Sequence, residues 1–533
     1  MHYLILLLIP LLAWSASKLI LWAFTLPGLR TKSLPPGPPV LPFLGNSHEI
    51  PKTGVHLLFT KWAKTYGPVF SLKIGRGTMV VLTSAYHGSQ LLDKRSAYSS
   101  NRPPSYVLGE RVFSGDHPMF MNADERWKLR RKLYFQLLQE SRCDREHIPL
   151  LEAESAQLVR DICLEPDSLM FHPGRMANSV TMCLVYGVRT PEYNTPHYVE
   201  LRKIMTELSV LGEIGATPPV ELISFTKYLP QRLWGNWKTR ADVLRKGIHD
   251  LHSPLVDRVM ERREKLGSCD SFLDHVLDQQ EKLKLTRNEI DVMCGNLLEG
   301  GTDTMANTIL TLCQAMALYP DFQEEAHREI DAVLSDTELP TWKDLERLPY
   351  VNMVVKELLR WRPPAPTAFP HALVKDDEIE GMKLPNGSTV VLNVWGVHQD
   401  ATRYRDPEKF NPSRFAAHTQ LASVYANSGD YEKRDHYSYG IGRRICPGIH
   451  LAERALFLGV AKLIWGFDFQ QKRDAAGNPI SIDIAPETGY DDGFLNQCRP
   501  FEVDITVRSE KRKEVILADA ARAEADIFSI YSR

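Results

Sequence analysis

The sequence predicts a mainly helical protein with a small β subdomain, preceded by one transmembrane helix at the N-terminus. Charged and apolar residues recur at helical spacing over most of residues 125–365, which favours a large helical body. The first 26 residues are almost wholly apolar. Strand-like alternation is confined to four short stretches, at residues 69–74, 79–82, 388–394 and 500–507.

Size, charge and cysteine usage narrow the class of protein. With 533 residues, 43% of them hydrophobic, the chain can bury a large core. Lys and Arg total 64 and Asp and Glu total 66, so the chain lacks the basic excess of a nucleic-acid-binding protein. The eight cysteines form no CxxC pair and no CxxC–HxxxH arrangement, which argues against zinc. We expect no nucleic-acid partner, and mostly reduced, buried thiols.

The N-terminal apolar segment runs from Tyr3 to Leu26 and is about long enough to span ~30 Å of hydrocarbon as a helix. Its one charge, Lys18, lies near an end, where it can reach the headgroups. A cleavable signal peptide is the alternative, but Arg30 and Lys32 follow the apolar run rather than precede it. Residues 1–30 are therefore expected to form a single-pass anchor with the rest of the chain on the cytosolic side.

Three further units follow the expected anchor. Residues 31–50 contain the run Leu34 to Pro39, which includes four prolines and should form a stiff hinge. Residues 51–508 are expected to form one catalytic domain, since no repeat or low-complexity block interrupts them. Residues 509–533 are rich in Ala, Lys and Glu and are expected to form an exposed helical tail.

One cysteine lies in an unusual segment. From Tyr439 the chain reads Tyr-Gly-Ile-Gly-Arg-Arg-Ile-Cys-Pro-Gly, and a helical run follows from Leu451 to Trp465. Backbone N–H groups and the N-terminus of this helix would stabilise a thiolate at Cys446, and the glycines would let the backbone approach a flat macrocycle. Arg444 would supply a cation for a propionate. The alternative is a buried structural cysteine at a glycine-rich turn.

This segment resembles the cysteine-loop signature of the cytochrome P450 family, FxxGxRxCxG. The match covers Gly442, Arg444, Cys446 and Gly448, and the departure is Tyr439, where the family usually has Phe. The resemblance implies the cytochrome P450 fold and a bound heme b, iron protoporphyrin IX, with the Cys446 thiolate as the metal ligand. The Tyr439 hydroxyl can change hydrogen bonding and redox tuning beside the sulfur.

A second segment, Thr286 to Leu318, predicts a helix that crosses the domain, with Thr286 and Glu289 as its capping box. Its middle reads Gly-Gly-Thr-Asp-Thr from Gly300, and the two glycines cost about 1 kcal/mol each relative to Ala. Residues that disfavour the local secondary structure, such as glycines within a helix, are expected at functional sites. The alternative is a surface helix with a glycine kink.

The same segment is similar to the oxygen-activating helix motif of the family, (A/G)GxDT(T/S). In the family the glycines, here Gly300 and Gly301, open a groove for dioxygen. Thr304 would then hydrogen-bond the activated oxygen, and Asp303 would relay protons from water. The second hydroxyl residue of the motif is replaced by Met305, which can alter proton delivery.

Weaker matches occur in the order the family requires. Glu357 and Arg360 resemble the ExxR pair, and Arg414 resembles the arginine that completes a buried structural cluster with them. Among the remaining matches, three residues would reach the heme propionates: Trp127 and Arg131 of a WxxxR motif, which share a helix face, and His371.

The resemblance implies an NADPH-driven monooxygenase most like fungal cytochromes P450 of specialised metabolism. No flavin or nicotinamide motif is visible, so a diflavin NADPH–cytochrome P450 reductase would be the partner, with cytochrome b5 as a second candidate, in the endoplasmic reticulum membrane. A P450-fold isomerase or dehydratase that does not use O2 is the main alternative, but such members tend to lose the acid and alcohol kept at Asp303 and Thr304. A membrane heme carrier or sensor is more distant.

The substrate is expected to be a mid-sized, largely apolar organic molecule, such as a fungal secondary metabolite with an aromatic polyketide skeleton. The segments expected over the heme are 101–122, the region near 205–240, 366–369 and 486–496. They contain few fixed charges and carry Tyr106, Val107, Phe113, Met119, Phe120, Phe369 and Phe494.

Overall fold

The computed structural model of the chain describes residues 28–491 and 493–531. The expected membrane anchor, residues 1–30, falls almost entirely in residues 1–27, outside the described residues. Among the helices that are described, none is both long enough and apolar enough to cross a bilayer.

The helical body is organised around α13 (Arg287–Leu318). This helix of 32 residues begins at the expected capping box, in which the Thr286 hydroxyl accepts from the Glu289 N–H and the Glu289 carboxylate accepts from the Thr286 N–H. At 1.5 Å per residue it extends about 48 Å, enough to cross the domain. The predicted long helix is confirmed.

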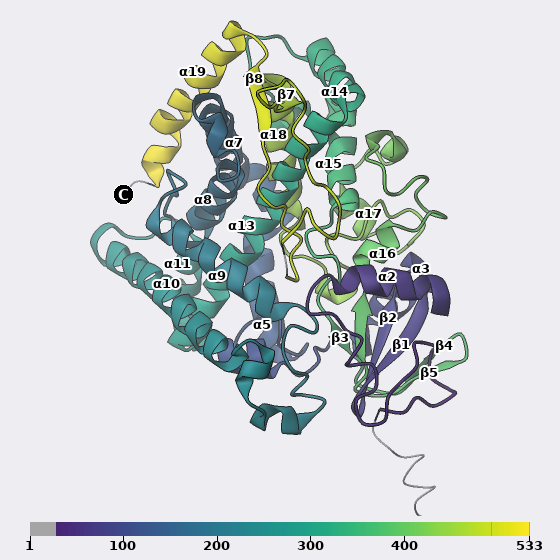
Figure 1. Ribbon diagram of the computed structural model, residues 1–533. Helices are drawn as coiled ribbons and strands as arrows, with labels where there is room; N and C mark the ends of the chain where they lie inside the picture. Colours follow the sequence, from purple (N-terminus) through teal and green to yellow (C-terminus); the bar gives the residue numbers. More distant parts are fainter. Residues whose placement is uncertain (1–27, 492, 532–533) are drawn as a thin grey trace, which may run out of the picture.

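Buried apolar faces pack the other long helices around α13 (Figure 1). Its neighbours include α8 (His172–Tyr186), α10 (Trp237–Leu266) and α18 (Ile449–Gly466), and α7 (Ile148–Leu164) packs against both α8 and α18. The remaining described helices before the C-terminal segment are α2 (Val55–Tyr66), α3 (Ala85–Gly88), α4 (Ser96–Ser99), α5 (Glu125–Leu138), α6 (Glu140–Arg142), α9 (Pro196–Gly212), α11 (Phe272–Asp278), α12 (Gln280–Leu283), α14 (Pro320–Val333), α15 (Pro349–Trp361), α16 (Val394–His398) and α17 (Ala422–Ala426).

The β subdomain lies at one side of the helical body, at the lower right of Figure 1. Its main sheet has the order β1 (Val69–Ile74), β2 (Gly77–Leu82), β6 (Thr389–Leu392) and β3 (His371–Ala372). The β2–β6 pair is parallel and the other two pairs are antiparallel. A separate hairpin joins β4 (Asp377–Ile379) to β5 (Met382–Leu384). The strands expected near 69–74, 79–82 and 388–394 are confirmed.

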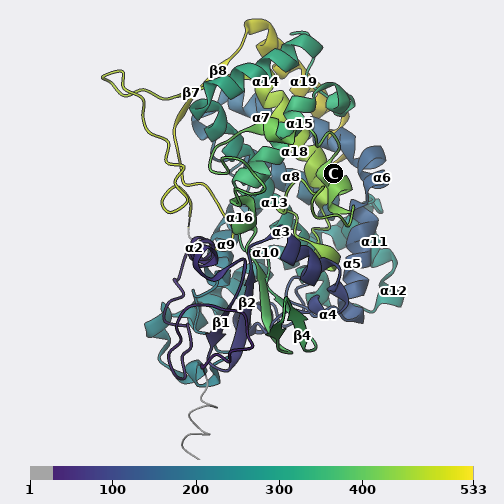
Figure 2. The same ribbon diagram turned by 90° about the vertical axis from the view of Figure 1, so that its right-hand side faces the viewer.

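The C-terminal part adds β7 (Phe467–Gln471), paired with β8 (Val503–Val507), and α19 (Glu510–Asp526). In Figure 2 the connection between β7 and β8 extends away from the helical body before it returns. The tail is helical, as expected, but it is not exposed all round. One face of α19 packs against α7 and buries Ile516 and Ala520, because apolar side chains recur there at helical spacing.

Candidate active site

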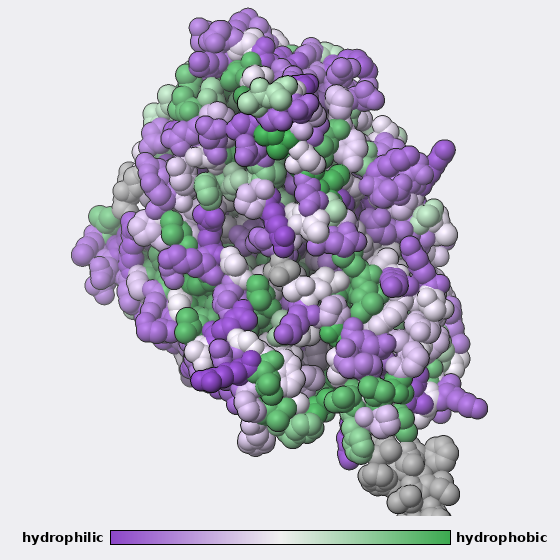
Figure 3. Space-filling view, in the orientation of Figure 1, coloured by the Kyte–Doolittle hydropathy of each residue, from purple (hydrophilic) through white to green (hydrophobic). Residues whose placement is uncertain are grey.

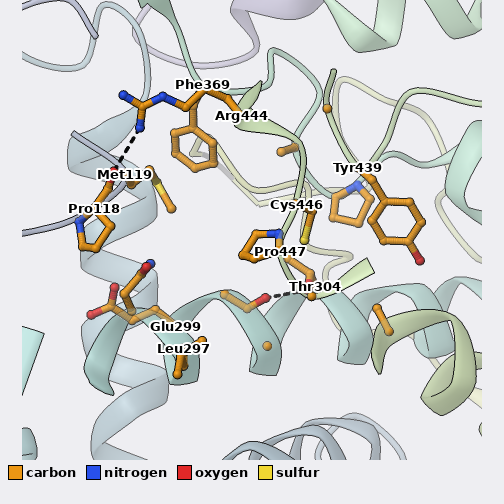
Figure 4. A pocket seen from close by; sticks show the side chains of 18 of the residues that line it. Pro118, Met119, Leu297, Glu299, Thr304, Phe369, Tyr439, Arg444, Cys446 and Pro447 are labelled. Carbon is orange, nitrogen blue, oxygen red and sulfur yellow. Dashed lines mark hydrogen bonds between the residues drawn. The ribbon is translucent and has the colours of Figure 1, made fainter. Parts of the chain in front are cut away.

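A cavity of about 310 Å³ lies between the Cys446 segment and α13 (Figure 4). In the figure the Cys446 sulfur faces the helix that carries Thr304, with Phe369 at the side of the gap. The structure brings seven of the eight predicted site residues to this cavity: Trp127, Arg131, Gly300, Thr304, His371, Arg444 and Cys446.

The Cys446 segment is fixed by its backbone. Gly442 has φ +63°, and a Cβ atom there would lie 2.1 Å from the Leu92 carbonyl oxygen, so only glycine fits. The Cys446 N–H donates to the Tyr439 carbonyl oxygen at 2.8 Å, which closes the loop directly before α18. Burial raises the pKa of the Cys446 thiol, while the Gly448 backbone N–H and Arg131 act in the opposite direction. A bound metal cation would favour the thiolate further.

Tyr439 packs beside this sulfur through its ring. Its hydroxyl points away from the cavity (Figure 4) and forms no hydrogen bond with the described residues. Burial, followed by the nearby Glu453 and Cys446 charges, holds the pKa of the phenol well above its usual range. The departure from Phe therefore adds a buried, neutral hydroxyl group on the far side of the ring from the cavity.

Three arginines line the cavity without a carboxylate partner. Arg102, Arg131 and Arg444 form no ion pair with any acidic residue in the described part of the chain. Burial lowers the pKa of each guanidinium, and for Arg444 burial and Arg131 lower it to about 10. The three side chains are half-buried, and partly desolvated cations without an anion are costly, so this arrangement suits a ligand that brings its own negative charges. The two propionates of heme meet that requirement.

Backbone carbonyl groups orient this cationic set. Arg444 Nε donates to Ser100 O at 2.8 Å, and its guanidinium lies 4.2 Å from the centre of the Trp127 ring. His371 Nδ1 donates to Ser99 O at 2.7 Å, and Arg102 Nε donates to Met119 O at 2.8 Å. Arg102 could not be predicted as a site residue, because a single arginine before two prolines carries no motif. Only the fold brings it beside Arg444.

The opposite wall of the cavity is one face of α13. Gly300 is exposed to the cavity, and a Cβ atom on Gly301 would lie 2.3 Å from Thr181 Cγ2 of α8. The Thr304 hydroxyl donates to Gly300 O at 2.8 Å and also faces the cavity. The two glycines thus leave space on one side and allow close helix packing on the other. The alternative of a surface helix with a glycine kink is wrong.

Asp303 is the predicted site residue that does not line the cavity. Its carboxylate lies on another face of α13, where Gln497 Nε2 donates to Oδ2 at 2.7 Å. Burial raises the pKa of Asp303 to about 6, although Gln497 and Arg202 favour the charged form. Met305, which replaces the second hydroxyl residue of the motif, lines the cavity.

The acid–base cluster behind the Cys446 segment has the expected composition. Arg360 donates from Nε to Glu357 Oε2 at 2.7 Å and from Nη2 to Oε1 at 2.8 Å. Arg414 Nε donates to Glu357 Oε1 at 3.1 Å. All three side chains are buried or nearly so. Bidentate geometry and burial make this cluster a structural support of the cavity rather than a reacting group.

A thiolate loop that faces a glycine-opened helix, beside arginines suited to propionates, defines a heme-thiolate protein. Residues 35–486 match the family model described as Cytochrome P450. The chain is 66% identical to the cytochrome P450 monooxygenase anuE of Penicillium roqueforti, over 90% of this chain and 98% of that protein. It is 47% identical to the cytochrome P450 monooxygenase yanC of Aspergillus niger, over 94% of each chain.

A solved structure of a zebrafish cytochrome P450 with abiraterone superposes with a TM-score of 0.67, covering 86% of this chain and 100% of that one at 22% identity. That likeness supports the fold. The chain belongs to the cytochrome P450 family and is a P450 monooxygenase. The family binds heme through a cysteine thiolate, and the expected likeness to fungal members is confirmed.

Proposed function

We propose that the protein inserts one oxygen atom of O2 into a mid-sized, largely apolar fungal secondary metabolite with electrons from NADPH. The overall reaction is R–H + O2 + NADPH + H⁺ → R–OH + H2O + NADP⁺. The observation that carries the proposal is the placement of Cys446 and the Thr304 hydroxyl on facing walls of one cavity. An isomerase or dehydratase that does not use O2 would have no need of that hydroxyl at the glycine-opened part of the wall.

Heme, when bound, supplies the oxygen chemistry, and the thiolate favours O–O cleavage. Cys446 would hold the iron, and the propionates would be held by Arg102, Arg131, Arg444, Trp127 and His371. Gly300 leaves room at the cavity face of α13. The Thr304 hydroxyl can turn from Gly300 O to a polar group in the cavity. Asp303, with a pKa of about 6, can take up and release a proton near neutral pH on the far side of the helix.

Electrons would come from a diflavin NADPH–cytochrome P450 reductase, with cytochrome b5 as an additional donor, at the endoplasmic reticulum membrane. An anchor at residues 1–30, a hinge at 31–50, a catalytic domain at 51–508 and a tail at 509–533 complete the proposed organisation.

Exposed apolar side chains support a second contact with the membrane. Figure 3 shows hydrophobic residues along the lower edge of the molecule, beside the point where the described chain begins. These side chains come from two segments, near residues 41–45 and 223–233, which both contact the β1–β2 turn. Gly45 forms a β-bridge with Ile74, and Gly75 lies against Ile223. Insertion of these residues into the interface would hold the body against the bilayer. The exposed residues are Leu41, Phe43, Leu44, Phe225, Tyr228 and Leu233.

The test is turnover with purified reductase, NADPH and O2, with Thr304→Ala as the variant. Loss of the hydroxyl in the cavity should leave NADPH consumption in place while product falls and peroxide rises. Thr311→Ala is the matched control, because Thr311 donates to Asn307 O at 2.8 Å on the same helix without facing the cavity. Equal product per NADPH in Thr304→Ala and the parent would contradict the role of Thr304, and the absence of any NADPH- and O2-dependent product would contradict the proposed function.

A further inference from the structure

An acid–imidazole pair lies in the cavity wall directly beside the glycines of α13. His117 Nε2 and Glu299 Oε2 are 2.9 Å apart, and both side chains are almost fully buried, at 1% and 4% exposure. Both residues line the cavity, and Figure 4 shows Glu299 on the same helix as Thr304. No motif in the sequence identifies this pair, because Glu299 and His117 are far apart along the chain.

The hydrogen bonds around His117 define its protonation. The Met119 N–H donates to His117 Nδ1 at 3.2 Å, so Nδ1 carries a lone pair. Nε2 therefore carries the proton in the neutral ring and donates to Glu299 Oε2. Glu299 thus receives one hydrogen bond from a neutral donor.

The second oxygen of Glu299 has no hydrogen-bond donor among the described residues. His252 Nε2 lies 3.9 Å from Oε1, which is beyond hydrogen-bond range. One turn earlier on α13, the Asn296 side chain also lines the cavity and forms no hydrogen bond with a described residue. A carboxylate can accept about four hydrogen bonds, and burying one that is so poorly satisfied is costly unless a ligand supplies the missing donor.

A buried acid elsewhere in the chain shows what a purely structural role looks like. Glu154 is fully buried and receives the Ser179 hydroxyl at 2.6 Å and Arg189 Nε at 3.0 Å on Oε1. Its Oε2 is paired with Arg175. Both oxygens of Glu154 are thus satisfied from within the protein, whereas Glu299 has one oxygen without a donor beside an open cavity.

Aromatic side chains surround this polar pair. The His117 ring lies 4.2 Å from Phe113 and 5.4 Å from Phe120, measured between ring centres. Another aromatic pair, Phe369 and Phe494, lines the same cavity with ring centres 5.2 Å apart. Such walls favour a flat ring, and the carboxylate favours a neutral hydroxyl donor over an anion.

We infer that Glu299, which accepts a hydrogen bond from His117, binds a hydroxyl group of the substrate. This inference rests on the proposed function. The substrate is then a neutral hydroxylated aromatic compound. The substrate O–H would donate to Glu299 Oε1. The pair is a specificity-determining contact, which orients the ring so that a carbon away from the hydroxyl faces the oxygen-binding part of the cavity.

Matched ligands test this inference on the heme-loaded protein. The probes are 2-naphthol against 2-methoxynaphthalene, 4-ethylphenol against 4-ethylanisole, and 4-ethylbenzoate as the anion. Dissociation constants come from the change in heme absorbance on ligand binding and, independently, from the rise in the thermal unfolding midpoint. Each phenol should bind about tenfold more tightly than its methyl ether, because the ether has no donor for a charged acceptor. The benzoate should bind more weakly than the phenol.

Glu299→Leu removes the acceptor and should bring the phenol-to-ether ratio close to one, mainly by weakening phenol binding. Glu299→Gln keeps a neutral acceptor oxygen and should give an intermediate ratio. The matched control is Asp291→Asn, an acid of the same helix that pairs with Arg287 outside the cavity and should keep the parental ratio. A ratio of one in the parent, an unchanged ratio in Glu299→Leu, or no binding of either phenol would overturn the inference. If the parent shows NADPH- and O2-dependent turnover but no phenol preference, the proposed contact of Glu299 with a substrate hydroxyl is wrong. The proposed monooxygenase activity would be unaffected.

Discussion

The loop that carries Cys446 is a single segment, residues 439–448, whereas the opposite side of the cavity combines α13 with residues 113–120, 368–369 and 494–495. On the first side, chain connectivity sets the geometry, since glycines and consecutive backbone hydrogen bonds place the sulfur. On the second side, side chains from separate loops meet only because the fold brings them together.

This difference separates two kinds of residue. Substitutions on the Cys446 side should change heme binding and stability, because a rigid loop and its buried support cannot adjust. Substitutions on the cavity face of the opposite side should mainly change which ligands bind, because each loop contributes one or two side chains.

The largest effect is expected behind the Cys446 segment, from Arg360→Ala. The substitution removes two of the charge-assisted hydrogen bonds to the fully buried Glu357 carboxylate and leaves that charge poorly paired. Breaking such a pair costs about 3–5 kcal/mol. We expect a large fall in the thermal unfolding midpoint and little heme in the purified protein. Arg328→Ala, which breaks an exposed i,i+3 pair with Glu325, is the control and should change stability by at most about 0.5 kcal/mol.

Asp303 lies on α13 but faces away from the cavity, so its substitution should change stability rather than ligand binding. Burial raises its pKa from 3.8 to about 6, so the protonated form is favoured in the folded protein. That stabilisation is complete below the unfolded pKa and is lost as the pH rises through about 6. Relative to Asp303→Asn, the parent should lose about 2.4 kcal/mol between pH 4 and pH 7.

Thermal unfolding midpoints of the two proteins across pH 4–8 measure this difference, with Asp291→Asn as the control. A parent-minus-variant difference that stays constant over the whole range would show that Asp303 is not held in its neutral form.

A smaller effect is expected for Arg444→Ala, within the Cys446 segment. The variant loses a cation suited to a heme propionate and the contact with Trp127. A charge-assisted hydrogen bond contributes about 1.5–3 kcal/mol, so heme should transfer to apomyoglobin about tenfold faster or more. Arg126→Ala, one turn from Arg130 on α5 and half-exposed, should transfer heme at the parental rate. Equal transfer rates for Arg444→Ala and the parent would contradict the propionate role.

The smallest effect is expected from Tyr439→Phe, although the residue lies beside Cys446. The hydroxyl has no hydrogen-bond partner among the described residues, so its removal loses no contact. Stability should stay within about 1 kcal/mol of the parent or rise slightly. A clear loss of stability in thermal unfolding would mean that the hydroxyl has a partner, such as a buried water molecule.

The same division explains how much the sequence could predict. The capping box at Thr286, the Cys446 loop and the Glu357 cluster follow from local spacing, and the structure reproduces all three. The membership of Arg102, His117 and Glu299 in the cavity wall could not be predicted, because each depends on contacts between distant segments. The orientation of Asp303 away from the cavity was also not evident, since a helical position beside two glycines does not by itself fix which face is enclosed.

The C-terminal helix gives a second example. A run rich in Ala, Lys and Glu predicts helix but not which side is covered. The burial of Ile516 and Ala520 depends on α7, more than 350 residues earlier in the chain.

The identity of the iron ligand is the central claim, and the ferrous carbonyl spectrum of the purified protein tests it most directly. The parent and Cys163→Ala, a variant of a half-buried cysteine on α7, should both show the red-shifted Soret band of thiolate-ligated heme. Cys446→Ala should lose that band, because no other described cysteine lines the cavity. A red-shifted band that persists unchanged in Cys446→Ala would contradict the assignment of the ligand.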